Sequence, residues 1–234
     1  QNCYGVVKNF IPYPQSGDET RTDGKTRELM PSGGLYQSVI VLGKLSIADS
    51  EMIEDGYLDN IFRVLSLEAE LQELSLDASI VKAHQHSAGA KKGASSLIGH
   101  SRGGASTKIH AVVDAYGYPV NLRLSEGQRN DINMAIPLLE PISLNGSQVL
   151  ADRGYDSNQL IDYIYDRGGE PTIPSRKGAR FERHCDWWLY KERHLVECFF
   201  LKLKAYRRIA TRYDKLASTY LGFICIASIL IWLK

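Results

Sequence analysis

Cysteine is scarce in this chain and is not arranged in any pattern typical of a disulfide framework or a zinc site. The four cysteines of the 234 residues stand at positions 3, 185, 198 and 225, with no CxxC pair and no regular spacing. This argues against a disulfide scaffold and a zinc ribbon, and it favours a reducing, cytosolic compartment. We also expect no signal peptide, because the charged start and apolar run of such a segment are absent from the first residues.

Long apolar runs are also absent, with one exception near the end of the chain. Residues 216–233 are almost uniformly apolar, and 18 residues is close to the lower limit for a membrane span. Ser218, Thr219 and Ser228 interrupt the run, and an amphipathic segment precedes it. We therefore predict a core helix that packs on a sheet, and no membrane partner.

The charge is nearly balanced overall, and only its distribution is informative. The formal net charge is +1, yet residues 1–75 hold 6 Lys/Arg against 12 Asp/Glu, while residues 171–215 hold 12 against 5. A basic block with interspersed aromatic residues is typical of a phosphate-binding surface. The alternative is an ordinary solvated helix surface. The aromatic residues are Trp187, Trp188, Tyr190, Tyr206 and Tyr213.

In the first third of the chain, Asp77 is the first residue that we single out as a candidate functional residue. Residues 1–34 are rich in turn-forming residues, residues 38–45 could be a strand or a helix fragment, and residues 52–74 have a helical pattern. From 74 to 81 apolar and polar residues alternate, which predicts a half-buried strand with Asp77 in the middle of its polar face. An acid is disfavoured in mid-strand. It could lie on the exposed face of an edge strand, or it could be a metal ligand held on a rigid element.

The next segments predict a histidine pair, a basic loop and a hairpin. His84 and His86 lack partners at zinc-finger spacing, so we favour a surface or DNA-facing role for them. Residues 88–104 predict a basic loop in which Arg102 could contact phosphate. Residues 107–114 and 120–124 predict the two strands of an antiparallel hairpin, and Asp131 is the expected N-cap of a short helix that ends near residues 140–141.

A second acid, Asp152, follows a short buried strand. The strand at 149–151 should deliver Asp152 at its carboxyl end, where the chain turns and Ser157 begins a helix that runs to Arg167. Sites in open α/β sheets are built at such ends. The alternative is a common strand-to-helix turn, with Asp156 as a cap. A strand at 170–173 and a basic loop at 174–183 should follow.

The stretch from Tyr190 to Lys204 carries the most informative functional pattern in the sequence. Its sequence is YKERHLVECFFLKLK. As one helix it would place a polar face, with residues suited to catalysis or binding, opposite an apolar face. A single carboxylate flanked by an aromatic hydroxyl and two cations suits an anionic ligand, although ordinary helix salt bridges are the alternative. The polar face would hold Tyr190, Arg193, Glu197 and Lys204. The apolar face would hold Trp188, Leu195, Val196, Phe199 and Leu203.

The spacing of Tyr190, Arg193, Glu197 and Lys204 resembles the Y-R-E-K signature of DDE transposases of bacterial insertion sequences, in particular the insertion-sequence-five family. The stretches LDASIVKAHQHSAGAKKG, GHSRGGASTKIHAVVDAYGYP and LADRGYD also carry the resemblance, which runs from about residue 74 to the C-terminus. It implies an α/β fold, an RNase H-like mixed sheet flanked by helices, in which three acids converge. By resemblance, Asp77, Asp152 and Glu197 would be the catalytic acids and the ligands of Mg²⁺, with Mn²⁺ as a substitute. The implied DNA contacts are Tyr190, Arg193 and Lys204, with Arg102, Lys108 and Arg153 as further predicted contacts.

The resemblance also implies a function and an organisation for the chain. We expect a DNA transposase that cleaves the ends of an insertion sequence and transfers the strand to target DNA. The alternatives are a hydrolysis-only nuclease of the same fold and an inactive DNA-binding remnant. Residues 71–234 would be the catalytic domain, and residues 1–70, which are acidic where the family is basic, would stand where the family recognises its terminal inverted repeats. The expected partners are DNA and a second copy of the chain, in the cytoplasm of a bacterium and associated with the nucleoid.

Overall fold

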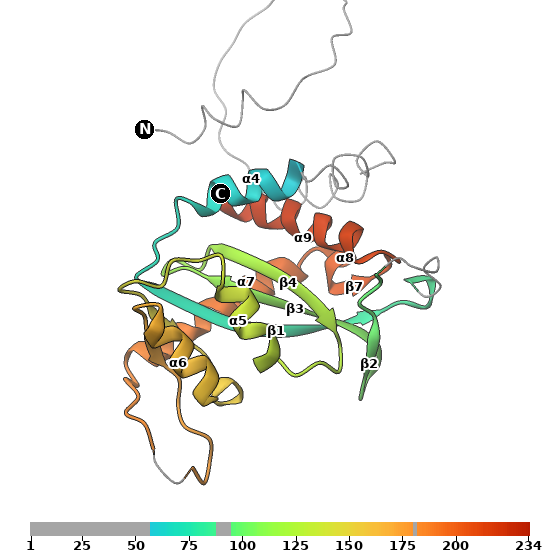
Figure 1. Ribbon diagram of the computed structural model, residues 1–234. Helices are drawn as coiled ribbons and strands as arrows, with labels where there is room; N and C mark the ends of the chain where they lie inside the picture. Colours follow the sequence, from blue (N-terminus) through green and yellow to red (C-terminus); the bar gives the residue numbers. More distant parts are fainter. Residues whose placement is uncertain (1–56, 88–94, 180–181) are drawn as a thin grey trace, which may run out of the picture. The chain divides into compact units, whose positions relative to one another are not determined.

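A computed structural model describes residues 57–87, 95–179 and 182–234, all of which lie in one compact unit (Figure 1). The turn-rich start of the chain, the short apolar run at 38–45 and the first part of the predicted basic loop, residues 88–94, lie outside the described residues.

In the described part of the chain, the strands form one seven-stranded mixed sheet. Its path is β2-β3-β1-β5-β6, with β4 added to β3 and β7 added to β1. Strand β3 is antiparallel to β1, β2 and β4, whereas β5 and β7 are parallel to β1 and β6 is parallel to β5. The resulting order β4-β3-β1-β5-β6 confirms the predicted RNase H-like sheet. The strands are β1 (Glu73–Ala83), β2 (Gly99–Ser101), β3 (Gly104–Val113), β4 (Pro119–Glu126), β5 (Gln148–Leu150), β6 (Glu170–Thr172) and β7 (Thr211–Arg212).

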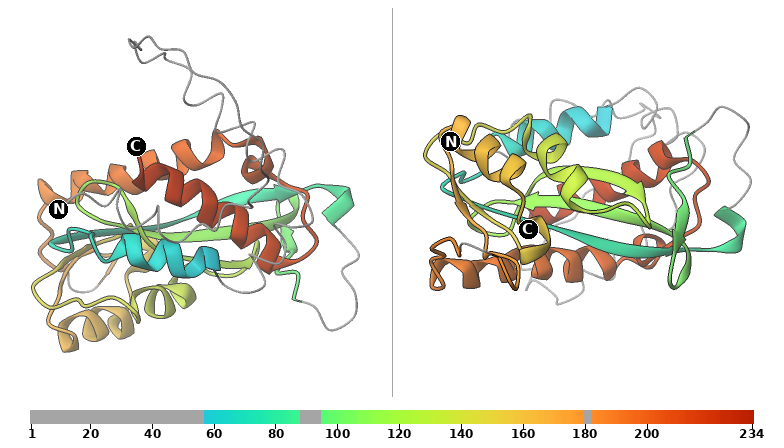
Figure 2. Two further views of the ribbon diagram at one scale, coloured as in Figure 1. Left: turned by 90° about the horizontal axis from the view of Figure 1, so that it is seen from above. Right: turned by 60° about the horizontal axis from the view of Figure 1, so that its bottom comes forward.

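Helices cover both faces of this sheet and bury two separate apolar cores (Figures 1 and 2). Helix α7 packs on β1 and β3 from one side, and α5 and α6 close the other side. Helices α4 and α9 pack against each other and against β4. The α-helices are α4 (Tyr57–Ser66), α5 (Ile132–Leu139), α6 (Asn158–Asp166), α7 (His194–Lys204), α8 (Arg207–Ala210) and α9 (Ala217–Trp232), and the 3₁₀ turns are η1 (Gln85–Ser87), η2 (Arg153–Tyr155) and η3 (Leu189–Arg193).

Strand β1 is central, which excludes the edge-strand interpretation of Asp77. It pairs with β3 along one side from Ser75 to Lys82, and with β5 and β7 at the two ends of the other side. The predicted alternation of burial does not hold along its whole length. Ile80 is 49% exposed and Val81 only 1%, because Val81 lies in the core that α7 covers.

The helical pattern predicted for residues 52–74 is wrong in its second half. Helix α4 ends at Ser66, the chain turns through Leu67 and Glu68, and β1 begins at Glu73. Leu74 then belongs to the core beneath α5 and α6. Pairing with β3 and β5 therefore outweighs the local preference of the sequence for helix.

The apolar run near the C-terminus forms the predicted core helix. Helix α9 packs on α4 and β4, and its Trp232 ring stacks on Tyr118 at 4.6 Å between centroids. The Trp232 Nε1–H donates to the carbonyl of Pro119 at 2.9 Å. No helix in the described part of the chain has the length and apolar character needed to cross a bilayer.

Candidate active site

Asp77 lies in the middle of β1, and its carboxylate faces α7. Its side chain is 23% exposed, and its Oδ1 accepts the N–H of Ala78 at 2.7 Å. Because β1 has neighbouring strands on both sides, the backbone that carries this carboxylate is fixed within the sheet.

Asp152 lies immediately after β5, at the carboxyl end that the sequence predicted. It caps the 3₁₀ turn η2, and its Oδ1 accepts the N–H of Gly154 at 2.8 Å. A Cβ at position 154 would lie 2.9 Å from that oxygen, so a larger residue there would require the Asp152 carboxylate to shift. Helix α6 begins directly after Ser157, as predicted, and Ser157 rather than Asp156 caps it, since its Oγ accepts the N–H of Leu160. Asp152 and the start of α6 are thus positioned by short local contacts.

The stretch from Tyr190 to Lys204 is not one continuous α-helix. A 3₁₀ turn, η3, runs to Arg193, and α7 begins at His194. The apolar face is otherwise as predicted, with Val196, Phe199 and Leu203 fully buried. Trp188 is the exception, because it lies before the regular helix and is 79% exposed.

Arg193 joins two of the predicted acids. Its Nη1 lies 3.0 Å from Oδ2 of Asp77, and its Nη2 lies 2.5 Å from Oε1 of Glu197, one turn along α7. The guanidinium also lies over the ring of Tyr190, 5.8 Å from its centroid. Arg193 therefore contacts two other signature residues, Tyr190 and Glu197, and the central strand through Asp77.

The protonation of Asp77 reflects this crowding of acids. Burial raises the pKa of Asp77, and the carboxylates of Asp152 and Glu197 raise it further. The Ala78 N–H and the Arg193 guanidinium work against this rise in pKa. Carboxylates that act on one another in this way share one small region. The fold therefore brings Asp77 and Glu197, which are far apart in the sequence, together on Arg193, and it places Asp152 near enough to act on the pKa of Asp77.

The predicted cations differ in how freely they could meet a ligand. Lys204 donates from Nζ to the carbonyl of Ile80 at 3.2 Å, and burial lowers its pKa. Arg102 and Arg153 are exposed, at the β2–β3 turn and in η2. Lys108 is only 12% exposed and donates to Asp131 and to the carbonyl of Arg129, so contact with DNA would require that ion pair to open.

The same ion pair corrects the expected role of Asp131. Asp131 stands at the N-cap position of α5, but its side chain caps no helix N–H. Its Oδ1 lies 2.7 Å from Nζ of Lys108 instead. The predicted N-cap position is correct, but the predicted cap hydrogen bond does not form, because the Asp131 carboxylate pairs with the Lys108 ammonium on β3.

Comparison with known proteins identifies the family. Residues 68–232 match the family described as Transposase DDE domain, which covers more than half of the chain. The chain belongs to the DDE transposase family. The predictions of a DDE transposase of bacterial insertion sequences and of a DNA transposase function are thereby confirmed.

Two relatives of this DDE transposase are associated with insertion sequences. A protein from Brucella ovis, described as a transposase for insertion sequence element IS6501, is 39% identical over 142 residues, 55% of this chain and 99% of its own length. A protein from Burkholderia cepacia, described as a transposase for insertion sequence element IS402, is 32% identical over 135 residues, 53% of this chain. The match spans 62% of the length of that second relative.

Solved structures of transposases are distant neighbours. A piggyBac transposase in a synaptic complex with hairpin DNA is 12% identical, with a TM-score of 0.39 over 68% of this chain and 46% of that chain. A Mos1 transposase in a paired-end complex with the left transposon end is 11% identical, with a TM-score of 0.28 over 88% of this chain and 67% of that chain. At these scores the likeness assigns no role to any residue.

The acids of this DDE transposase have the right chemistry for a hard divalent cation, but they do not form a ready-made metal centre. Carboxylate oxygens are the ligands that Mg²⁺ prefers. Within residues 57–87, 95–179 and 182–234, no three His, Cys, Asp or Glu side chains stand close enough together to hold a metal ion. The guanidinium of Arg193 lies between Asp77 and Glu197 and pairs with both, so its single positive charge offsets part of their negative charge. The acids thus match a divalent cation in their donor chemistry, and in this structure Arg193 pairs with two of them.

Tyr155 is a residue of the site that sequence reasoning missed. It lies on η2, three residues after Asp152, and is 2% exposed. Burial raises the pKa of its hydroxyl, and the carboxylates of Asp77, Asp131 and Asp152 add to the rise. A buried phenol beside several carboxylates can donate a hydrogen bond and cannot ionise readily. The only hint in the sequence is the aromatic residue directly after the Asp-Arg-Gly turn.

Proposed function

We propose that this chain cleaves the ends of an insertion sequence and transfers the cut strand to target DNA, with Asp77, Asp152 and Glu197 as catalytic, metal-holding acids. The observation that carries the proposal is the contact of Asp77 and Glu197 through Arg193, with Asp152 near enough to act on the pKa of Asp77. Asp77 and Glu197 share one guanidinium, and Asp152 and Glu197 both raise the pKa of Asp77. Such a cluster of acids is costly unless a cation neutralises it.

In this proposal the acids hold divalent Mg²⁺, with Mn²⁺ as a substitute. A bound pair of such ions supplies Lewis-acid stabilisation of the attacking and leaving oxygens in phosphoryl transfer. The chain's own residues would position the DNA. Arg193 would leave Asp77 and bind a DNA phosphate, to which its planar guanidinium can donate two hydrogen bonds. Lys204 would contact phosphate through the single charge of its ammonium. Tyr190 would keep the Arg193 guanidinium over its ring during this exchange.

Further DNA contacts and the organisation of the chain belong to the same proposal. Arg102 and Arg153 are exposed cations that would meet the phosphate backbone, and Lys108 would join them only after release from Asp131. Residues 71–234 would form the catalytic domain, and residues 1–70 would occupy the place of the end-recognition segment. Two copies of the chain would act together, because two transposon ends must be joined in concert.

A joining assay tests the proposed function. Wild-type protein is incubated with Mn²⁺, linear DNA that ends in the terminal inverted repeats of its own element, and a supercoiled target plasmid. We expect covalent joining of the 3′ ends to the plasmid, and none in EDTA. Cleavage without joining would favour a hydrolysis-only nuclease instead. Binding without cleavage would favour an inactive remnant.

Arg193 should compete with divalent cations for the acids. In Arg193→Gln the cation between Asp77 and Glu197 is lost, so we expect Mn²⁺ to raise the unfolding temperature more than it does in the wild type. A site held at 100 times its Kd would stabilise the fold by about 2.7 kcal/mol. The measurement is thermal unfolding at increasing Mn²⁺ concentrations without DNA.

Two further variants make this measurement specific. Arg102→Gln removes an exposed arginine at the β2–β3 turn and should respond to Mn²⁺ as the wild type does. Adding Asp152→Asn to Arg193→Gln should remove the response. Equal Mn²⁺ responses of the wild type and Arg193→Gln would contradict the competition.

A further inference from the structure

A second cluster of aromatic and basic residues lies at the far end of β1, away from the three acids. Strand β7 pairs with β1 there, with Thr211 opposite Lys82 and Arg212 opposite Ala83. His84 follows directly and donates its N–H to the carbonyl of Arg212 at 2.8 Å. At about 3.3 Å per residue, His84 lies roughly 23 Å along the strand from Asp77. This cluster is therefore separate from the candidate active site.

The centre of the cluster is Tyr213, which projects from a firmly anchored backbone. Arg212 before it is fully buried and donates to Thr107 Oγ1 at 2.6 Å and to the carbonyls of Asp214 and Lys215. Asp214 after it is buried and ion-paired with Arg208 at 2.7 Å. Tyr213 itself is 46% exposed. An exposed ring on so constrained a backbone loses little entropy when it binds a ligand.

Histidines support the Tyr213 ring from one side. The rings of His84 and Tyr213 are tilted by 31° with centroids 4.6 Å apart, and His86 meets His84 edge-on at 4.6 Å. The sequence predicted a surface or DNA-facing role for these two histidines. His84 packs against the tyrosine ring, and His86 extends the aromatic surface behind His84.

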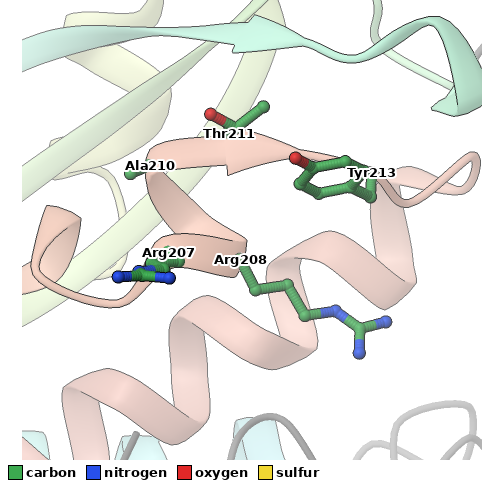
Figure 3. A pocket seen from close by; sticks show the side chains of 5 residues that line it. All are labelled: Arg207, Arg208, Ala210, Thr211 and Tyr213. Carbon is green, nitrogen blue, oxygen red and sulfur yellow. The ribbon is translucent and has the colours of Figure 1, made fainter.

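Next to the ring is a hollow of about 500 Å³ with a basic lining (Figure 3). Arg207 and Arg208 line it from α8, Thr211 lines it from β7, and Tyr213 lines it from the chain directly after β7 (Figure 3). No carboxylate from the described part of the chain lines it. Arg207 is exposed, and among the described residues it forms no ion pair or side-chain hydrogen bond. The hollow thus offers a cation and two hydroxyls beside an aromatic ring.

We propose that Tyr213, supported by His84 and His86, is a stacking platform for an unpaired base of a DNA strand whose phosphate contacts Arg207. Aromatic rings beside cations bind single strands because a base can stack on the ring only when it is unpaired. Charge complementarity favours this occupant, since the hollow lies within the basic block of residues 171–215. The proposal rests on the proposed function for its DNA partner, and it adds a strand contact remote from the acids.

The test is the binding of a fluorescein-labelled 15-nucleotide oligothymidylate in EDTA, followed by fluorescence anisotropy. We expect Tyr213→Ala to weaken binding roughly tenfold and Tyr213→Phe to keep it, because stacking needs the ring and not the hydroxyl. Arg207→Ala should also weaken binding. Tyr165→Ala, which removes a 56% exposed tyrosine on α6, should bind as the wild type does. Binding to a blunt duplex of the same length should be unchanged in Tyr213→Ala.

Several outcomes would overturn the proposal that Tyr213 is a stacking platform. These are oligothymidylate binding by Tyr213→Ala at wild-type strength, an equal loss in Tyr213→Phe, or an equal loss on the duplex. If the wild type also joins DNA ends, such a result leaves the proposed function standing. Conversely, Tyr213-dependent binding by a protein that joins no ends would overturn the proposed function and support the platform.

Discussion

Glu197→Gln is expected to abolish cleavage and strand transfer while DNA binding stays close to that of the wild type. Glutamine keeps the size of the side chain but loses the negative charge that a divalent cation needs. Metal-assisted stabilisation of a phosphoryl-transfer transition state is worth several kcal/mol. Its loss corresponds to a fall in rate of roughly 10³-fold or more, because each 1.36 kcal/mol is about tenfold.

The fold itself should tolerate this change. Glu197 is 54% exposed, and its main described contact is the pair with Arg193 on the same helix. Exposed pairs of this kind contribute only about 0–1 kcal/mol to stability. The unfolding temperature should therefore stay near that of the wild type, and a loss of joining will reflect chemistry and not unfolding.

Glu192→Gln is the matched control for this experiment. Glu192 lies on η3 in the same segment, its side chain is 45% exposed, and its Oε2 lies 3.9 Å from Nδ1 of His194. It should keep full activity. The assay is the joining of labelled transposon ends to a plasmid, with binding measured in parallel. Loss of binding together with activity in Glu197→Gln would refute its assignment as a catalytic acid.

Lowering the pH should weaken the fold through His110, which is buried in β3. The His110 side chain is 1% exposed, its Nε2 pairs with Oγ of Ser125 at 2.8 Å, and its Nδ1 has no hydrogen-bond partner in the described structure. Burial lowers the pKa of His110 from 6.5 to about 4. Asp131, whose Oδ1 lies 4.0 Å away, opposes this shift, while Lys108 and Arg129 reinforce it.

The direction of the pH effect follows from these two pKa values. Between pH 6.5 and about 4 the unfolded chain binds a proton at His110 that the folded chain does not. The free energy of unfolding therefore falls as the pH drops through this window and is fully retained above it. At 1.36 kcal/mol per unit, the total loss is about 3 kcal/mol. Above pH 7 this residue should contribute no pH dependence.

Urea unfolding at pH 7.5, 6.0 and 5.0 measures this contribution. His110→Gln cannot take up the proton and can still bond to Ser125, so its stability should fall less between pH 7.5 and 5.0 than that of the wild type. The carboxyls of Asp77, Glu73 and Asp114, whose pKa values are raised mainly by burial, remain in both proteins and cancel in the comparison. Identical pH slopes would show that His110 is not the group responsible.

Local patterns in the sequence were sufficient for several parts of the fold. The alternation at 107–114 and 120–124 predicted the β3–β4 hairpin, and a short apolar run followed by Asp152 and Ser157 predicted β5, the turn and the start of α6. These features depend on contacts between residues close in sequence, so residue type and spacing are enough to predict them. The Y-R-E-K spacing likewise indicated the family, because four residue types at fixed intervals along the chain form a specific pattern.

Other parts of the molecule were decided only by the tertiary structure. The sequence could anticipate a pair between Arg193 and Glu197 at i, i+4, but not the bond from Arg193 to Asp77, 116 residues away. It could not show that β1 is central, that Lys108 is held by Asp131, or that Tyr155 is buried beside the acids. Each of these facts depends on which strands become neighbours and which helices cover them, and that order is set by burial of the whole chain, not by local residue preferences.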